Sequence, residues 1–181
     1  MAKITTVLLD CDGTLAGDTI FYFRSGDVAR VFSTYDGEGI SLLKQHGIDV
    51  AIVTKSSARE IQNRAEWLNI RCFMGIDDKV EFLEWLSLES LLELDEICFM
   101  GNDLNDLGAM KLCGYPVAPH NANMTVWDYC RKNGYVTDAV GGNGAVRELV
   151  DHLIAYDFFD PESPINGAGQ VDPDFVHPPY P

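Results

Sequence analysis

Two carboxylates separated by a single residue stand near the start of the chain, where an apolar run ends. The run closes at Leu9 and is followed by Asp10, Cys11, Asp12 and Gly13, and the glycine permits a sharp turn. Because side chains alternate along a strand, the two aspartates can share an orientation where the strand opens into a loop. One carboxylate of such a pair can serve as nucleophile and metal ligand while the other exchanges a proton.

The same Asp-x-Asp-Gly pattern also occurs in turns and at the start of calcium-binding loops. An EF-hand loop that began at Asp10 would need a glutamate at its twelfth position, and that position is Phe21. This kind of calcium loop is therefore excluded, whereas a turn without catalytic function stays open at this stage.

Apolar runs alternate with helical patterns along the chain. This alternation predicts an α/β fold, a Rossmann-like and mainly parallel sheet with helices on both faces. Strands are expected at residues 4–9, 49–53, 71–74, 96–100, 115–118 and 135–136. Helices are expected at 37–46, after 57, from 77 or 78 to about 92, from after 106 to about 114, at 123–132 and at about 144–156.

Several helix boundaries carry capping residues in the sequence. Asp36 is expected to cap the helix at 37–46, and Ser57 with Glu60 is expected to form a capping box for the next helix. The last helix is expected to bury one apolar face, made of Val146, Leu149, Val150, Leu153 and Ile154.

A β-hairpin is predicted between the first strand and the first helix. Two β-prone runs, Thr19–Phe23 and Val28–Thr34, are joined by a turn sequence at 24–27. The insertion, about residues 17–35, is too short for a cap domain. A site at the adjoining edge of the sheet would therefore be open.

Polar residues directly follow three of the predicted strands. Asp10, Thr54 and the segment 102–106 stand at these strand ends, and α/β sheets bind ligands beyond the carboxyl ends of their strands. Lys79 starts a predicted helix, where a cation opposes the helix dipole at a cost of roughly 0.3–1 kcal/mol. This placement indicates an anionic partner. The alternatives are a solvated surface lysine, an ordinary strand-end threonine and, at Asp103 and Asp106, acids at the start of a helix.

Composition limits the function classes. The 181 residues include 28 acidic and 13 basic side chains, and the net charge of −15 opposes binding to nucleic acid or anionic membranes. No apolar run approaches a membrane span and no signal-peptide pattern opens the sequence, so a cytoplasmic location is expected. Five cysteines without a Cys-x-x-Cys pair predict reduced thiols. Residues 1–156 are expected to form one domain, and 157–181 a proline-rich acidic C-terminal tail.

The ordered motifs resemble those of the haloacid dehalogenase superfamily of phosphotransferases. They are Asp10-x-Asp12-Gly13-Thr14, Thr54, Lys79 and Gly101-Asn102-Asp103-x-x-Asp106. The hairpin and three further motifs are similar to the capless sugar-acid phosphatases: Gly75-x-x-Asp78-Lys79, Val117-Ala118-Pro119 and Gly141-Gly142-x-Gly144-Ala145-Val146-Arg147-Glu148. That group comprises 3-deoxy-D-manno-octulosonate 8-phosphate phosphatases, nonulosonate 9-phosphate phosphatases and a module of sialic acid cytidylyltransferases. The resemblance covers roughly residues 4 to 155.

The resemblance implies a catalytic role for both aspartates. Asp10 would be the nucleophile that forms an aspartyl phosphate, and Asp12 would protonate the leaving oxygen and then deprotonate the attacking water. Mg²⁺ would be the cofactor, bound by Asp10, the backbone carbonyl of Asp12, and Asn102 or Asp103.

The resemblance also implies residues that hold the substrate. Thr54 and Lys79 would bind the phosphate, with Lys79 also counted as catalytic, and Gly13 and Lys55 are further candidates for substrate binding. Asp106 would orient Lys79 or a metal-bound water from behind.

The sequence departs from the resembling family near the expected sugar side of the site. Asn102 stands where an aspartate is usual, Lys55-Ser56 stands where a glycine and then an arginine or glutamate are usual, and Tyr35 replaces a common arginine. Asn102 contributes no charge to a metal site. Cys11 replaces an aliphatic residue and is interpreted as a packing residue.

The expected function is a Mg²⁺-dependent phosphomonoesterase that acts on a small phosphorylated sugar acid. Two alternatives are a catalytically weak phosphatase-like module for oligomerisation or binding, and a phosphatase of another small phosphate ester. A nucleic-acid substrate and a membrane partner are not expected.

By resemblance, the protein would form a homo-oligomer, a tetramer, in which neighbouring subunits cover the open site. The hairpin residues suited to such a contact are Ile20, Phe21, Tyr22, Phe23, Val31 and Phe32. Packing of the hairpin on its own domain is the alternative.

Overall fold

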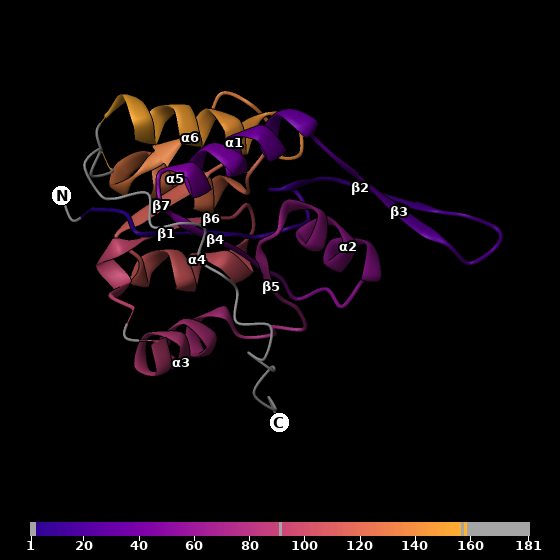
Figure 1. Cartoon of the computed structure of the whole chain (residues 1–181), viewed down its shortest axis with the longest axis horizontal. Coiled ribbons are helices and arrows are strands. Elements are labelled where there is room, and N and C mark those ends of the chain that lie inside the picture. Colours follow the sequence, from indigo (N-terminus) through magenta and orange to yellow (C-terminus); the bar gives the residue numbers. More distant parts are fainter. Residues whose placement is uncertain (1–2, 91, 157, 159–181) are drawn as a thin grey trace.

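A six-stranded sheet forms the centre of the computed structural model, which describes residues 3–90, 92–156 and 158 (Figure 1). Neighbouring strands run parallel in the order β5-β4-β1-β6-β7-β8. The strands are β1 (Thr6–Leu9), β4 (Asp49–Val53), β5 (Arg71–Phe73), β6 (Ile97–Met100), β7 (Tyr115–Ala118) and β8 (Tyr135–Val136). The predicted Rossmann-like α/β fold is confirmed.

Helices cover both faces of the sheet. They are α1 (Thr34–Gln45), α2 (Arg59–Leu68), α3 (Lys79–Ser90), α4 (Leu104–Leu112), α5 (Met124–Asn133) and α6 (Ala145–Ala155), and a short 3₁₀ helix, Leu94–Glu96, precedes β6. Buried side chains of α1, α2 and α6 share one core layer with the sheet. Those of α3, α4 and α5 form the layer on the opposite face.

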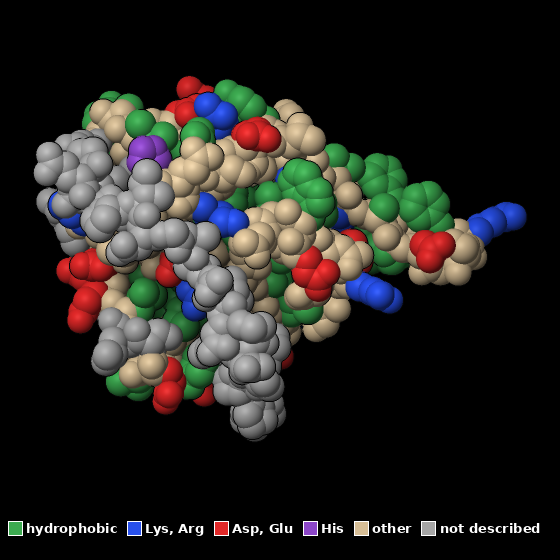
Figure 2. Space-filling view, in the orientation of Figure 1, with side chains coloured by type: hydrophobic (Ala, Val, Ile, Leu, Met, Phe, Trp, Pro, Cys, Tyr) green, Lys and Arg blue, Asp and Glu red, His purple; other side chains and the backbone are tan. Residues whose placement is uncertain are grey.

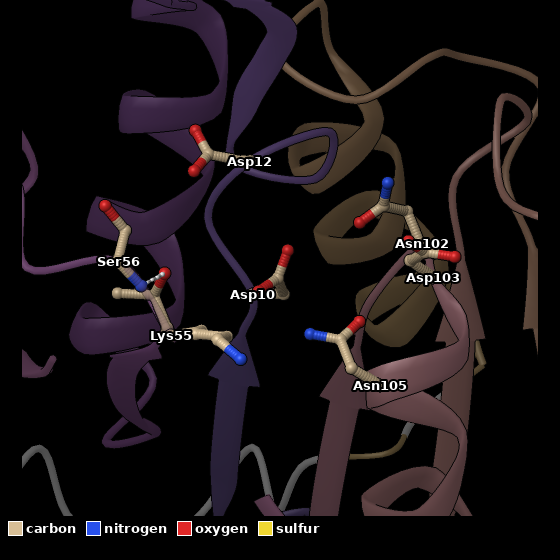
Figure 3. Close-up of a pocket in the computed structure, with 8 residues that line it drawn as sticks. Asp10, Asp12, Lys55, Ser56, Asn102, Asp103 and Asn105 are labelled. Carbon is tan, nitrogen blue, oxygen red and sulfur yellow. Dashed lines mark hydrogen bonds between the residues drawn. The ribbon is translucent and has the colours of Figure 1, made fainter. Parts of the chain in front are cut away.

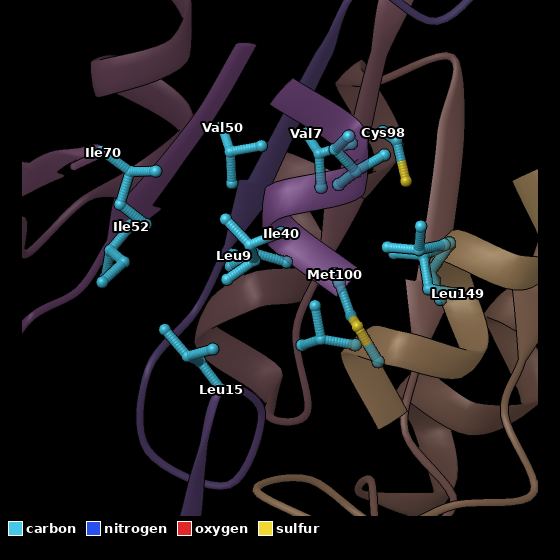
Figure 4. Close-up of a cluster of buried hydrophobic side chains, with 14 of the residues drawn as sticks. Val7, Leu9, Leu15, Ile40, Val50, Ile52, Ile70, Cys98, Met100 and Leu149 are labelled. Atoms are coloured by element: carbon cyan, nitrogen blue, oxygen red, sulfur yellow. The ribbon is translucent and has the colours of Figure 1, made fainter. Parts of the chain in front are cut away.

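Strand β1 lies at the centre of the sheet and is buried on both sides. Val7 and Leu9 contribute to the layer that contains Ile40 of α1 and Leu149 of α6 (Figure 4). Leu8 points into the other layer. A parallel strand covered on both faces is apolar throughout, which accounts for the uninterrupted run before Asp10. The strand therefore fixes the position of Asp10 at the edge of a well-packed core.

The predicted hairpin projects from the body of the molecule (Figure 1). It consists of β2 (Ala16–Tyr22) and β3 (Val28–Phe32), which pair antiparallel. No other helix or strand lies between β1 and α1, a stretch that the structure describes completely, so the insertion contains no cap domain.

The apolar side chains of the hairpin are largely exposed, and Figure 2 shows them along the projection. Tyr22 is 78% exposed, and Phe21, Phe23 and Val31 are each about half exposed. The alternative considered above, that the hairpin packs on its own domain, therefore does not hold for these four residues.

The cap of α1 differs from the prediction. Ser33 is the N-cap, and its hydroxyl accepts hydrogen bonds from the backbone N–H groups of Tyr35 and Asp36. Asp36 lies inside the helix, is fully buried, and accepts hydrogen bonds from the N–H groups of Gly144 (3.1 Å) and Arg147 (2.9 Å). Its carboxylate thus caps the distant helix α6 and ties it to α1, since the first N–H groups of a helix need partners.

Two smaller expectations are also corrected. Helix α2 begins after Ala58, which provides no side-chain cap, so the capping box of Ser57 and Glu60 does not form. Glu60 contacts Arg30 of the hairpin instead. On α6 the predicted apolar face is buried except for Ile154, which is 41% exposed in the last turn.

The cap that Asp36 supplies to α6 is expected to contribute to stability. Replacing Asp36 with alanine should lower the free energy of unfolding by about 2 kcal/mol, because an N-cap is lost and buried N–H groups lose their acceptor. Urea unfolding measures the change. Glu38→Ala, at an exposed position of the same helix, is the matched control and should change it by less than about 0.5 kcal/mol. Equal effects of the two substitutions would contradict the role of the cap.

The predicted division at residue 156 is not tested, because the tail at 157–181 lies outside the described residues apart from Phe158. Phe158 adds a backbone hydrogen bond to Ile4 and packs against the core layer of α6. None of the described helices has the length and apolar character to cross a membrane.

Candidate active site

A pocket opens at the carboxyl ends of β1, β4 and β6 (Figure 3). It is lined by Asp10, Asp12, Thr54, Lys55, Ser56, Asn102, Asp103 and Asn105. Figure 3 shows Asp10 in the middle, with Lys55 and Ser56 on one side and Asn102 and Asn105 on the other. The chain passes from β1 to β4 and β5 on one side and then crosses to β6 on the other side of β1, and such a switch point creates a crevice.

Lys79 lies behind the pocket and is almost completely buried. Its Nζ donates to Asp10 Oδ1 at 2.6 Å and to Asp106 Oδ1 at 2.5 Å. Burial disfavours the charge of the ammonium, but the two carboxylates outweigh that effect and raise the pKa of Lys79. The anionic partners that the helix-starting position indicated are therefore these two aspartates.

Asp106 organises the loop after β6. Its Oδ2 accepts hydrogen bonds from the N–H groups of Asn102 (2.9 Å) and Asp103 (3.0 Å), while its Oδ1 binds Lys79. Gly101 is needed beside it, since a Cβ at that position would lie 2.5 Å from Asp106 Cγ. Asp106 thus joins Lys79 and the loop into one unit from behind the pocket.

The two oxygens of Asp10 have different surroundings. Oδ1 binds Lys79, whereas Oδ2 lies 3.3 Å from the side-chain oxygen of Asn102, which also lies 3.0 Å from the carbonyl oxygen of Asp12. If the amide turned over, its nitrogen would donate to both oxygens. Burial, followed by the charge of Asp106, raises the pKa of Asp10 to about 7, although Lys79 works in the opposite direction. A cation at this place would favour the ionised form.

These three oxygens fit a magnesium ion. Mg²⁺ binds oxygen ligands at about 2.0–2.1 Å in an octahedron, so neighbouring ligand oxygens lie about 3.0 Å apart. The amide oxygen of Asn102 already stands at nearly this spacing from the carboxylate oxygen of Asp10 and from the backbone carbonyl oxygen of Asp12. Within the described residues no group of three or more His, Cys, Asp or Glu side chains is placed to hold a metal ion.

The remaining predicted residues have other contacts. Thr54 is buried, and its Oγ1 accepts a hydrogen bond from the N–H of Ser56 (Figure 3). The Oδ1 of Asp103 accepts from the N–H of Leu104 and caps α4, although the residue lines the pocket. Lys55 is exposed and pairs with Asp77 at 3.0 Å.

Three residues near the pocket were not named among the predicted site residues. Ser56 and Asn105 line it, and Arg30 of β3 binds the carboxylate of Asp12, with 2.6 Å between Arg30 Nε and Asp12 Oδ1. The only sequence signal for Arg30 was a single charged residue in an otherwise apolar strand of the hairpin. That signal does not reveal its partner.

The fold and the site together define a protein of the haloacid dehalogenase superfamily. A solved structure of a putative hydrolase of this superfamily from Legionella pneumophila superposes with a TM-score of 0.79 at 33% identity, over 85% of this chain and 84% of that one. No family model matches the chain.

A curated relative gives the particular family. The 3-deoxy-D-manno-octulosonate 8-phosphate phosphatase of Yersinia pestis is 32% identical over 154 residues, which cover 84% of this chain and 81% of the relative. The enzyme of that name from Moraxella catarrhalis, solved with magnesium, phosphate and its sugar acid, superposes with a TM-score of 0.79 at 33% identity, over 84% of this chain and 86% of that one. This chain belongs to the 3-deoxy-D-manno-octulosonate 8-phosphate phosphatase family.

Proposed function

We propose that this protein is a Mg²⁺-dependent phosphomonoesterase that hydrolyses a small phosphorylated sugar acid. The reaction class rests on family membership, and the substrate class rests on the names of the relatives from Yersinia pestis and Moraxella catarrhalis. A 3-deoxyoctulosonate 8-phosphate or a nonulosonate 9-phosphate is the substrate type that we infer.

One observation carries the proposal most directly, namely the different use of the two Asp10 oxygens. Lys79 holds Oδ1 at 2.6 Å, which leaves Oδ2 beside Asn102 and the Asp12 carbonyl at the pocket. Lys79 at Oδ1 and a metal at Oδ2 would hold this carboxylate in a fixed orientation at the pocket and reduce its repulsion of a phosphate. This is the arrangement that an aspartate nucleophile needs.

The transfer proceeds through an aspartyl phosphate. A carboxylate oxygen of Asp10 forms a bond to phosphorus, the bond from phosphorus to the sugar oxygen breaks, and that oxygen takes a proton from Asp12. A water molecule then gives its proton to Asp12 and bonds to phosphorus, and the bond to Asp10 breaks with its electron pair returning to the carboxylate. Magnesium, held by Asp10, the Asp12 carbonyl and Asn102, neutralises phosphate charge. Asp103 is the alternative to Asn102 as third ligand.

Positive charge beside the pocket supports an anionic substrate. The chain has a net charge of −15, so local cations must offset its repulsion of a phosphate. Lys79 lies behind the pocket and Lys55 lines it. We infer that Thr54 and Lys79 hold the phosphate, that Gly13 and Lys55 contact the substrate, and that Asp106 orients Lys79.

A panel of phosphate esters tests the proposal. The full chain is assayed for phosphate release from 3-deoxy-D-manno-octulosonate 8-phosphate, nonulosonate 9-phosphates, common hexose phosphates and p-nitrophenyl phosphate. We expect turnover that is lost with EDTA, restored by Mg²⁺ and highest with a sugar-acid phosphate. Higher turnover of a neutral hexose phosphate would overturn the substrate class. Absence of turnover with every ester would favour a binding module instead.

The geometry around Asn102 leads to a prediction about magnesium affinity. Gly13 has a φ of +83°, and a Cβ there would lie 2.2 Å from Asn102 Nδ2. Gly13→Ala should therefore displace Asn102 and raise the Mg²⁺ concentration for half-maximal activity at least about tenfold, as changes beside metal ligands do. Gly17→Ala is the matched control, because a Cβ at that position meets nothing within 4 Å. An unchanged Mg²⁺ requirement in Gly13→Ala would contradict the proposed ligand set.

We further propose that the exposed hairpin mediates a homo-oligomer. The side chains of Phe21, Tyr22, Phe23 and Val31 form an apolar surface suited to a second copy of the chain. Sedimentation analysis tests this proposal, and a monomer at micromolar concentration would contradict it. The tetramer and the cytoplasmic location stay predictions.

A further inference from the structure

The carboxylate of Asp12 is less firmly enclosed than that of Asp10. The Asp12 side chain is 36% exposed and follows the end of β1, in a loop. In the described part of the chain, both hydrogen bonds to its carboxylate come from Arg30. Arg30 Nε donates to Oδ1 at 2.6 Å and a terminal nitrogen donates to Oδ2 at 3.2 Å. The orientation of the carboxylate therefore depends on this one guanidinium.

The guanidinium itself is fixed by residues of other segments. The Arg30 side chain is only 6% exposed, and it binds Glu60 of α2 and the hydroxyl of Ser56, the latter at 3.4 Å. A planar guanidinium that contacts both oxygens of a carboxylate fixes the plane of that carboxylate as well as its position. The two ion pairs Glu60–Arg30 and Arg30–Asp12 thus connect α2, through the hairpin, to the loop after β1.

We propose that Arg30 is a positioning residue, which holds Asp12 in the orientation required to protonate the leaving oxygen of the substrate. This inference rests on the proposed phosphatase function. A carboxylate offers about four acceptor sites, of which Arg30 occupies two, so Asp12 keeps sites for the proton that it transfers. The hairpin is then part of the active site and not only a surface for association.

Substrates with different leaving groups distinguish a loss of proton transfer by Asp12 from a general loss of structure. A sugar oxygen needs a proton as it leaves, whereas p-nitrophenolate leaves without one. We expect Arg30→Met to lower kcat for the best-hydrolysed sugar phosphate of the panel by about 30- to 100-fold, within the usual contribution of a general acid. The KM should change less than about threefold, and so should the rate of the initial p-nitrophenol burst from p-nitrophenyl phosphate.

Three further variants sharpen the test. Arg30→Lys should recover part of the lost kcat, because it keeps the charge but not the two-pronged contact. Glu60→Gln should show the same dependence on the leaving group more weakly, and should add little to Arg30→Met, since both act through one unit. Arg24→Met is the matched control, an exposed arginine at the hairpin turn, and should behave as the wild type.

The outcomes separate this inference from the function on which it rests. Equal losses with both substrates, or an Arg30→Met enzyme within threefold of the wild type on the sugar phosphate, would overturn the role of Arg30. Near-UV circular dichroism shows whether Arg30→Met folds. If it does not, the decision rests on Glu60→Gln and Arg30→Lys, and on the ratio of their kcat for the sugar phosphate to their p-nitrophenol burst rate. A wild type that hydrolyses no ester overturns the proposed function itself.

Discussion

Asp10→Asn is expected to reduce kcat for phosphate release by at least about 10³-fold, because an amide is not a nucleophile toward phosphorus. The wild type should also yield an acyl phosphate that hydroxylamine cleaves, and the variant should not. Both are measured with Mg²⁺ and the best substrate of the panel. The side chain keeps its shape, so the pocket at the end of β1 should persist.

The control for this substitution is Asp18→Asn. Asp18 is exposed on the hairpin, where its carboxylate accepts a hydrogen bond from Thr19. The change removes a negative charge of the same kind without touching the pocket, and activity should stay within twofold of the wild type. An Asp10→Asn enzyme that keeps more than a tenth of its activity would rule out an aspartyl phosphate at this residue.

Lys79→Met is expected to affect stability as well as activity. The methionine fills a similar volume but leaves the buried carboxylates of Asp10 and Asp106 without their cation. Breaking a buried ion pair in this way costs about 3–5 kcal/mol. Urea unfolding should show this loss, whereas Lys55→Met, which removes an exposed partner of Asp77, should cost less than about 1 kcal/mol.

The loss in Lys79→Met should depend on pH. Burial already raises the pKa of Asp10 to about 7, and removal of the lysine raises it further. A carboxyl whose pKa is higher in the folded state binds its proton more tightly there, so folding is favoured as pH falls below that value. The stability difference from the wild type should therefore be smaller at pH 5.5 than at pH 8.

A second substitution provides the check on this interpretation. Adding Asp106→Asn to Lys79→Met removes one of the two unpaired charges and should restore part of the stability but no activity. If the double variant is less stable than Lys79→Met, charge burial is not the cause of the loss.

The sheet and the place of the pocket could be predicted because buried parallel strands leave a clear pattern. Strands such as β1 and β4 contain continuous apolar runs, and the residues that follow them, Asp10 and Thr54, lie at the carboxyl edge by topology alone. The position of Lys79 indicated an anionic partner through the helix dipole. The identity of that partner, one aspartate that follows β1 and one in the first turn of α4, required the three-dimensional structure.

The parts that could not be predicted depend on contacts between distant segments. Ser33 and Asp36 are both good caps by residue type, and the local sequence does not show that Asp36 is engaged by α6. Arg30 carries no motif, and its role follows only when the hairpin folds beside α2 and reaches Asp12. Long-range polar contacts of this kind leave no periodic signal in a single sequence.

The link between α1 and α6 has a consequence for how the chain folds during its synthesis. Asp36 binds N–H groups that lie 108 and 111 residues further along. A nascent chain that has left the ribosome only as far as β8 has its pocket-forming loops, but it lacks α6, and the face of the sheet that α6 covers is exposed to solvent. Contacts over such long separations form late, and a ribosome stalled before this helix should hold a loosely packed, protease-sensitive intermediate.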